Sequence, residues 1–140
     1  MSTDRFLLDT FFALALLNPR DEYHAHARDF FPRLPSAGQI VVTEAVLTEI
    51  ANYFGERNRS AAVTLIEHLI AQPNVHVVNV DPTLFRSSFD LYKQRPDKEW
   101  GLTDCISFVV MQRFGLTDAL TGDHHFEQAG FRVLFPSSDQ

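Results

Sequence analysis

Four acidic residues occupy positions from which their side chains could converge on one point. Asp9 directly follows a short apolar run, and Asp123 comes shortly after another one late in the chain. Asp104 opens a segment with helical periodicity, where the helix dipole and free backbone amides favour a carboxylate. Glu49 lies in the helix expected after the second apolar run, and its side chain is long enough to reach back toward the strand ends. Sites in open parallel sheets form outside the carboxyl ends of the strands, so these four residues are candidates for one site.

Carboxylates gathered in this way predict metal-dependent chemistry. Four negative charges close together repel one another unless they share protons or bind a cation. Ligands that are all oxygen atoms suit Mg²⁺ or Mn²⁺, and Mg²⁺ commonly binds a few carboxylates together with phosphate oxygens of a substrate. Such an ion activates water and stabilises charge on phosphate oxygens. The reaction indicated is hydrolysis of a phosphodiester.

The elements that must position these acids alternate between short apolar runs and helical patterns. Strands are predicted at residues 6–8, 40–42, 75–78, 116–120 and 131–135. Helices are predicted between them, ending near Leu17, Phe31, Gly55, Pro73, Gln94 and Gly115. Parallel strands need crossover connections, so this alternation predicts a three-layer α/β/α fold with a mostly parallel central sheet of four to five strands.

The length and composition predict one folded domain. The chain has 140 residues, of which 45% are hydrophobic and 21% charged, which excludes disordered and low-complexity classes. Residues 1–136 are assigned to a single domain and residues 137–140 to a C-terminal tail. On the helix that Asp81 and Pro82 open, the aromatic residues Phe85, Phe89 and Tyr92 are expected to face inward.

Charge and cysteine content narrow the class of protein further. A net charge of −6 argues against a broad electrostatic binder of nucleic acid, although a cluster of acidic metal ligands contributes to that total. The single Cys105 forms no intramolecular disulfide, and its apolar neighbours favour a buried thiol over a nucleophile. No apolar run approaches the ~20 residues that span a bilayer. We expect a cytoplasmic protein that does not associate with membranes.

Four segments resemble one known family. They read LLDTFFAL around Asp9, VTEAVLTEI around Glu49, GLTDCISF around Asp104 and LTGDHHFEQAGF around Asp123. Together, in this order and spacing, they resemble the PIN-domain family and within it the toxin ribonucleases called VapC. The resemblance covers nearly the whole chain.

The resemblance implies a metal-dependent endoribonuclease that uses Mg²⁺ or Mn²⁺ and acts as the toxin of a toxin–antitoxin pair. By this match Asp9, Glu49, Asp104 and Asp123 take the catalytic, metal-binding positions, and Thr10 and Thr121 match polar positions that orient ligands. The implied partners are an RNA substrate, a cognate antitoxin and a second copy of the chain in a homodimer.

Other functions and other residues remain open at this point. A receiver-like domain also gathers acids around Mg²⁺ and phosphorylates one of them, and a PIN-fold protein could instead serve RNA maturation or only bind RNA. Glu44 lies about 140° from Glu49 around their helix, so the two cannot both face the site. Asp118 is expected to face solvent from its strand. A zinc site at the adjacent residues His124 and His125 is disfavoured because spaced His or Cys partners are missing.

Two further groups of residues are candidates for contacts with partners. Five basic residues flank the predicted site and could bind RNA phosphates: Arg57, Arg59, Lys93, Arg95 and Lys98. Four phenylalanines on the early helices, Phe11, Phe12, Phe30 and Phe31, give more aromatic surface than a small core needs. An exposed share of them would serve a dimer interface or an antitoxin groove.

Overall fold

The computed structural model describes residues 4–137, so residues 138–140 of the predicted tail lie outside the described residues. Its central sheet has five strands, all parallel, in the order β3-β2-β1-β4-β5. The strands are β1 (Arg5–Leu8), β2 (Gln39–Thr43), β3 (Val75–Val78), β4 (Asp118–Leu120) and β5 (Arg132–Val133). The predicted parallel sheet of four to five strands is confirmed.

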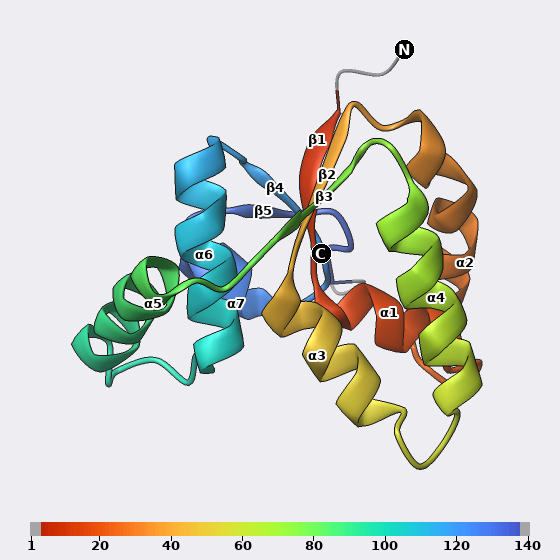
Figure 1. The fold of residues 1–140 in the computed structure, drawn as a ribbon, viewed down its shortest axis with the longest axis horizontal. Helices are drawn as coiled ribbons and strands as arrows, with labels where there is room; N and C mark the ends of the chain where they lie inside the picture. The colour runs from red at the N-terminus through yellow and green to blue at the C-terminus, as the bar shows by residue number, and fades with distance from the viewer. Residues whose placement is uncertain (1–3, 138–140) are drawn as a thin grey trace.

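Helices cover both faces of this sheet, as the three-layer prediction requires (Figure 1). One layer holds α1 (Thr10–Leu17), α2 (His24–Phe30), the 3₁₀ helix η1 (Phe31–Ser36), α3 (Glu44–Tyr53) and α4 (Arg59–Ala71). The other layer holds α5 (Pro82–Gln94), α6 (Leu102–Phe114) and α7 (His124–Gln128). α2 ends at Phe30, close to the predicted end near Phe31, and η1, which contains Pro32 and Pro35, follows it directly.

Alternation along the strands divides the apolar core in two. Phe6 and Leu8 of β1 pack toward α1–α4, whereas Leu7 between them packs toward α5–α7. Successive side chains of a strand point to opposite faces, so a strand buried on both faces must be apolar throughout. This explains why β1 reads as a continuous apolar run rather than as an alternating one.

The sheet order places a topological switch point beside β1. The chain passes from β1 to β2 and β3 on one side, and then crosses to β4 and β5 on the other. Crevices at such a point, outside the carboxyl ends of the strands, are where α/β proteins bind ligands. The order also differs from the 2-1-3-4-5 arrangement of receiver-like domains, because β3 here is an edge strand and Asp81 after it caps α5. The receiver-like alternative is therefore wrong.

The orientation predicted for α5 is also wrong. Phe85 and Tyr92 are each 46% exposed and Phe89 is half-buried, so these rings line the outer side of the helix. The inner side is formed by Leu84, Leu91 and the fully buried Ser88. The Ser88 hydroxyl donates to the Leu84 carbonyl at 2.7 Å, which satisfies its hydrogen bonding inside the protein. A hydrophobicity pattern does not anticipate a buried serine and exposed rings.

The phenylalanines of the early helices fill the core more than they form a surface. Phe12 is fully buried, and Phe11, Phe30 and Phe31 are partly buried against the same cluster. Phe12 and Phe30 both contact the ring of Phe135.

Within the described residues, no helix is long and apolar enough to cross a membrane.

Candidate active site

Asp9 lies at the carboxyl end of β1 and immediately precedes α1. Its side chain is only 4% exposed, and its Oδ2 accepts a hydrogen bond from Thr121 Oγ1 at 2.8 Å. Burial raises the pKa of Asp9 to about 7; the charges of Asp104 and Asp123 also act upward, and the Thr121 hydrogen bond acts downward. Without a cation, Asp9 therefore exchanges a proton near neutral pH.

Asp104 lies in the first turn of α6 and faces the same point from the other helical layer. Its Oδ2 accepts from the backbone N–H of Gly101 at 3.3 Å and lies 3.0 Å from Nδ1 of His125 on α7. Burial raises the pKa of Asp104, and the charge of Asp123 adds to the rise, while His125 and the Gly101 amide oppose it. The position at a helix N-terminus thus offsets part of the cost of burying this carboxylate.

Asp123 completes the group from the segment that follows β4. It caps α7, where its Oδ1 accepts from the His125 backbone N–H at 2.9 Å. Its own N–H donates to Thr121 Oγ1 at 3.1 Å, so one buried hydroxyl links Asp9 and Asp123. Asp104 and Asp123 are thus near enough to Asp9 for their charges to act on its pKa.

Gly122 is needed for the close packing of this segment. A Cβ on Gly122 would lie 2.6 Å from Cζ of Phe11 and 3.2 Å from the carbonyl oxygen of Phe135. A side chain here would force either the Phe11 ring or the segment that holds Thr121 and Asp123 to move. Sequence reasoning treated Gly122 only as part of the motif.

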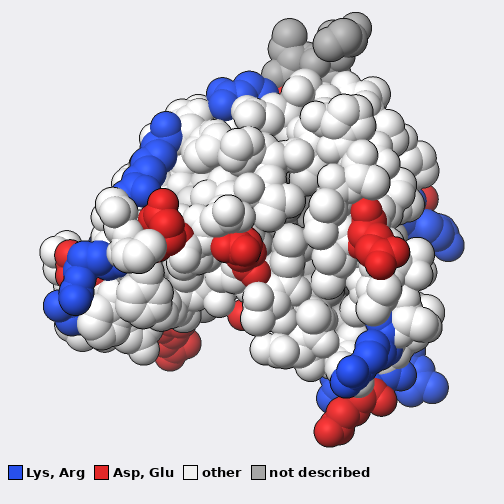
Figure 2. Space-filling model, in the orientation of Figure 1, with Lys and Arg blue, Asp and Glu red and all other residues white. Residues whose placement is uncertain are grey.

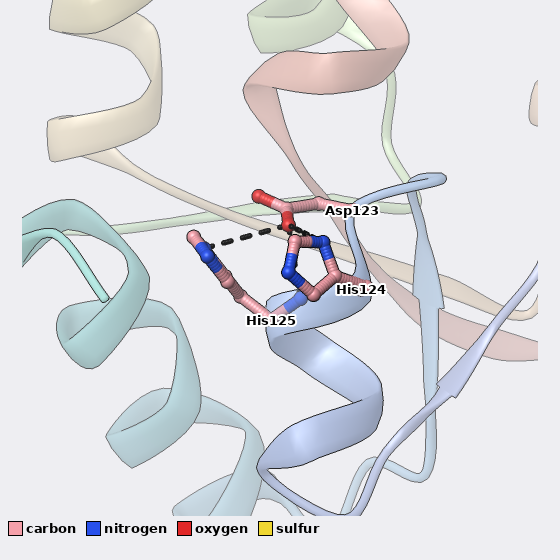
Figure 3. A group of neighbouring side chains, drawn as sticks. All are labelled: Asp123, His124 and His125. Carbon is pink, nitrogen blue, oxygen red and sulfur yellow. Dashed lines mark hydrogen bonds and ion pairs between the residues drawn. The ribbon is translucent and has the colours of Figure 1, made fainter. Parts of the chain in front are cut away.

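His125 is a member of the site that sequence reasoning missed. The residues Asp123, His124 and His125 offer donor atoms that all lie within 4.8 Å of one another. Figure 3 shows the Asp123 carboxylate between the two imidazoles, with Oδ1 at 3.7 Å from Nδ1 of His124 and 3.4 Å from Nδ1 of His125. The histidine pair therefore has an acidic partner in Asp123. His125 also contacts Asp104 of the neighbouring helix α6. The signal for this role in the sequence was that the two histidines directly follow Asp123.

Glu49 is not brought into this group. Its side chain is exposed on α3, and it is not among the acids whose charges raise the pKa of Asp9. Glu44 on the same helix makes a different contact, because its Oε1 accepts a hydrogen bond from the Val80 backbone N–H at 2.7 Å.

Asp118 lies opposite Arg132 in the β4–β5 register and forms a bidentate pair with the Arg132 guanidinium at 2.8 and 2.6 Å. Asp118 thus has a structural partner away from the acid group.

Thr10 is buried beside Asp9, and its Oγ1 has no hydrogen-bond partner within the described part of the chain. An unsatisfied buried hydroxyl is uncommon and calls for a partner that the protein atoms do not supply. Together with three crowded carboxylates, two of them with a raised pKa, this donor set fits a hard divalent cation and its bound water.

The five basic candidates divide into two groups, one after α3 and one around the end of α5. Arg57 lies 4.8 Å from the ring of Tyr53, and Arg59 donates to the Gly55 carbonyl at 3.1 Å, both after α3. Figure 2 shows basic side chains over α5 at one side and below α3 at the other, separated by a hollow in the lower outline. Arg95 is committed to Asp97 through two hydrogen bonds of 3.0 Å, which raise the pKa of Arg95. Lys93 in turn lies 3.5 Å from Asp90, so its charge is also partly balanced.

Comparisons with known proteins agree with this architecture. The model of the PIN domain family matches residues 6–132. The Mycobacterium tuberculosis protein "23S rRNA-specific endonuclease VapC20" is 26% identical over 129 residues, spanning 92% of this chain and 97% of the relative. The crystal structure of that VapC20, described as a sarcin–ricin loop cleaving toxin, superposes with a TM-score of 0.78 at 25% identity and covers 90% of this chain and 95% of its own.

A second solved structure shows the same fold at low sequence identity. VapBC2 from Rickettsia felis, bound to a DNA fragment from its promoter, matches with a TM-score of 0.66 at 10% identity and covers 92% of this chain and 96% of the other. A likeness at this identity concerns the backbone architecture alone.

Proposed function

We propose, from the premise that this chain belongs to the PIN domain family, that it is a metal-dependent endoribonuclease and the toxin of a toxin–antitoxin pair. The observation that carries the proposal is that Asp104 and Asp123, from two further elements, lie close enough to the buried Asp9 at the end of β1 for their charges to raise its pKa. Three acids held this close cost stability unless a cation or a proton shares them. A binding module for RNA alone has no need of such a cluster.

Asp9, Asp104 and Asp123 are the residues that would hold Mg²⁺ or Mn²⁺. A bound ion of this kind supplies a Lewis acid and a water of lowered pKa. Thr121 holds the Asp9 carboxylate in place, because its hydroxyl donates a 2.8 Å hydrogen bond to Asp9 Oδ2. Thr10, next to Asp9 in the chain, has a buried hydroxyl without a hydrogen-bond partner among the described residues. Glu49 belongs to the proposed set by the family match, and its exposed position on α3 makes it the acid to test separately.

His125 holds Asp104 and Asp123 in their relative positions. Its Nδ1 lies 3.0 Å from Asp104, and its backbone N–H donates to Asp123. One residue therefore contacts both acids from α7. We assign His125 a positioning role.

The substrate class follows from the relative. VapC20 is described as cleaving the sarcin–ricin loop of 23S rRNA, and this chain spans nearly the whole of that protein. We propose that this chain cleaves a looped segment of structured RNA, that a cognate antitoxin neutralises it in the cytoplasm, and that it works as a homodimer. Recognition of RNA through unpaired loops is general, because A-form duplexes hide their base edges.

Cleavage of a sarcin–ricin loop hairpin by the purified protein tests this proposal. Wild type should cut the RNA with Mg²⁺ or Mn²⁺ and stop in excess chelator. Asp104→Asn should lower the rate at least about 100-fold, since removing one charged ligand displaces the metal and the water it activates. The matched control is Asp118→Asn, which alters an acid that pairs with Arg132 instead. Full cleavage in chelator, or equal loss in both variants, would contradict the proposal.

A further inference from the structure

Two adjacent histidines at the start of α7 converge on one carboxylate oxygen (Figure 3). Nδ1 of His124 lies 3.7 Å from Oδ1 of Asp123, and Nδ1 of His125 lies 3.4 Å from the same atom. The two imidazole rings are 4.6 Å apart between their centroids. Neighbouring residues of a helix do not normally face each other. The arrangement therefore gathers two nitrogen donors and one oxygen donor in a way that the helix alone does not require.

The spacing of these three donor atoms matches that of ligands around a transition metal. Zn²⁺ binds imidazole nitrogen and carboxylate oxygen at about 2.0–2.2 Å, so two ligand atoms of one tetrahedral ion lie about 3.4 Å apart. The two distances to Oδ1 of Asp123 are 3.4 and 3.7 Å, and all three donor atoms lie within 4.8 Å of one another. The His124 side chain is 70% exposed, so its ring has room to turn toward an ion.

The fold supplies the partners that the spacing of the sequence does not show. On sequence alone a zinc site is disfavoured, because spaced His or Cys partners are missing. In the structure the partners are carboxylates: Asp123 caps α7, and Asp104 of α6 lies 3.0 Å from Nδ1 of His125. These three side chains are largely buried, whereas His124 is exposed. An ion can thus enter from solvent past His124 and reach the inner donors.

The nitrogen donors decide which ions this group prefers. Mg²⁺ takes oxygen ligands, whereas imidazole suits Zn²⁺, and Mn²⁺ is the weakest binder of its series at such sites. The acid group of Asp9, Asp104 and Asp123 offers only oxygen atoms and so suits the hard ion of the proposed function. The two sets of donors share Asp123 but differ in ligand chemistry, so they select different metals.

We propose that Asp123, His124 and His125 form a second metal site, selective for Zn²⁺, and that Zn²⁺ bound there inhibits RNA cleavage. The inhibition rests on the proposed ribonuclease function, and the binding does not. Zn²⁺ at this point takes Oδ1 of Asp123, and its positive charge repels a Mg²⁺ ion at the acid group. It also displaces the proton that His125 and Asp104 share, and so ends the contact that positions Asp104.

Isothermal titration calorimetry of the tag-free protein with Zn²⁺ tests the site, in excess Mg²⁺ so that the acid group is occupied. The wild type should bind one Zn²⁺ per chain. His124→Ala should weaken this binding at least about 10-fold, because it removes one of the ligands. Circular dichroism checks the fold of the variant, whose altered side chain is exposed in the wild type. His76→Ala is the matched control, since His76 is an exposed histidine on the edge strand β3.

Cleavage of RNA in Mg²⁺ measures the consequence of Zn²⁺ binding. Zn²⁺ should inhibit the wild type, and a higher concentration of Mg²⁺ should reverse the inhibition. Each variant is compared with its own rate in Mg²⁺ alone. The Zn²⁺ concentration that halves this rate should rise at least about 10-fold in His124→Ala and stay at the wild-type value in His76→Ala.

The outcomes separate this inference from the proposed function. Equal Zn²⁺ affinity in the wild type and His124→Ala would overturn the site, whatever the cleavage assay gives. Binding that depends on His124 but leaves cleavage unaffected would overturn the inhibition. A wild type that binds Zn²⁺ through His124 and cleaves no RNA would support the site and contradict the ribonuclease function instead.

Discussion

Replacing Asp9 by Asn should stabilise the metal-free protein in a manner that depends on pH. The pKa of Asp9 is raised from 3.8 to about 7 in the folded state, so the folded protein binds a proton that the unfolded chain has released. The contribution of Asp9 to the stability of the wild type is therefore most favourable below about pH 4 and is lost as pH rises through the interval from about 4 to about 7. Asn carries no charge and removes this dependence.

The magnitude follows from the size of the shift. At about 1.4 kcal/mol per pKa unit, a rise from 3.8 to about 7 corresponds to about 4 kcal/mol at pH 8. The buried amide of Asn still has to find partners, so we expect Asp9→Asn to gain about 2–4 kcal/mol at pH 8 and close to nothing at pH 4. Mn²⁺ should stabilise the wild type and reduce the difference, since it binds the native acid group and not the dispersed acids of the unfolded chain.

Urea denaturation in chelator at pH 4, 6 and 8 measures these differences in the free energy of unfolding. Asp29→Asn is the control, because this residue is exposed on α2 beside Arg28. The reasoning is refuted if Asp9→Asn and wild type are equally stable at pH 8, or if their difference is as large at pH 4.

Substitutions at three further positions probe how the site is built. Gly122→Ala should cost about 1–3 kcal/mol and most of the RNA cleavage, because its Cβ would lie 2.6 Å from Phe11; unchanged thermal stability would contradict the close packing. Thr121→Val should cost about 1–3 kcal/mol and lower cleavage at least about 10-fold by removing the bond to buried Asp9, whereas Thr121→Ser should retain both. Glu44→Gln keeps an acceptor for the Val80 N–H and should leave cleavage and stability near wild type, and loss of cleavage would place Glu44 in the site.

The sheet and most of the acid group were predictable because their signals are local. A strand buried on both faces must be apolar throughout, and an acid that follows such a strand in a parallel sheet has to lie at its carboxyl edge. Asp9 satisfies both conditions, Asp123 comes shortly after the buried end of β4, and Asp104 adds a helix N-terminus. The burial that raises the pKa of Asp9, and the nearby charges of Asp104 and Asp123 that add to the rise, then follow from the topology, since the end of β1 and the starts of α6 and α7 lie together.

The features that escaped prediction depend on contacts between distant segments. His125 reaches Asp104 only because α7 docks against α6, and nothing in the spacing of the sequence reports that contact. The face of α5 was misassigned because Ser88 is buried through a hydrogen bond to its own helix while Phe85 is exposed. From hydrophobicity alone, Phe85 would be placed inside and Ser88 outside. The exposure of Glu49 likewise depends on how α3 leaves the sheet.

The position of bound Mn²⁺ in a crystal of the wild-type protein tests the central claim most directly. Anomalous scattering locates the ion without reference to its ligands. We expect a peak in contact with carboxylate oxygens of Asp9, Asp104 and Asp123, and we expect Asp104→Asn crystals soaked in the same way to lose it. A peak held only by Asp123, His124 and His125, or one that persists unchanged in Asp104→Asn, would contradict the account.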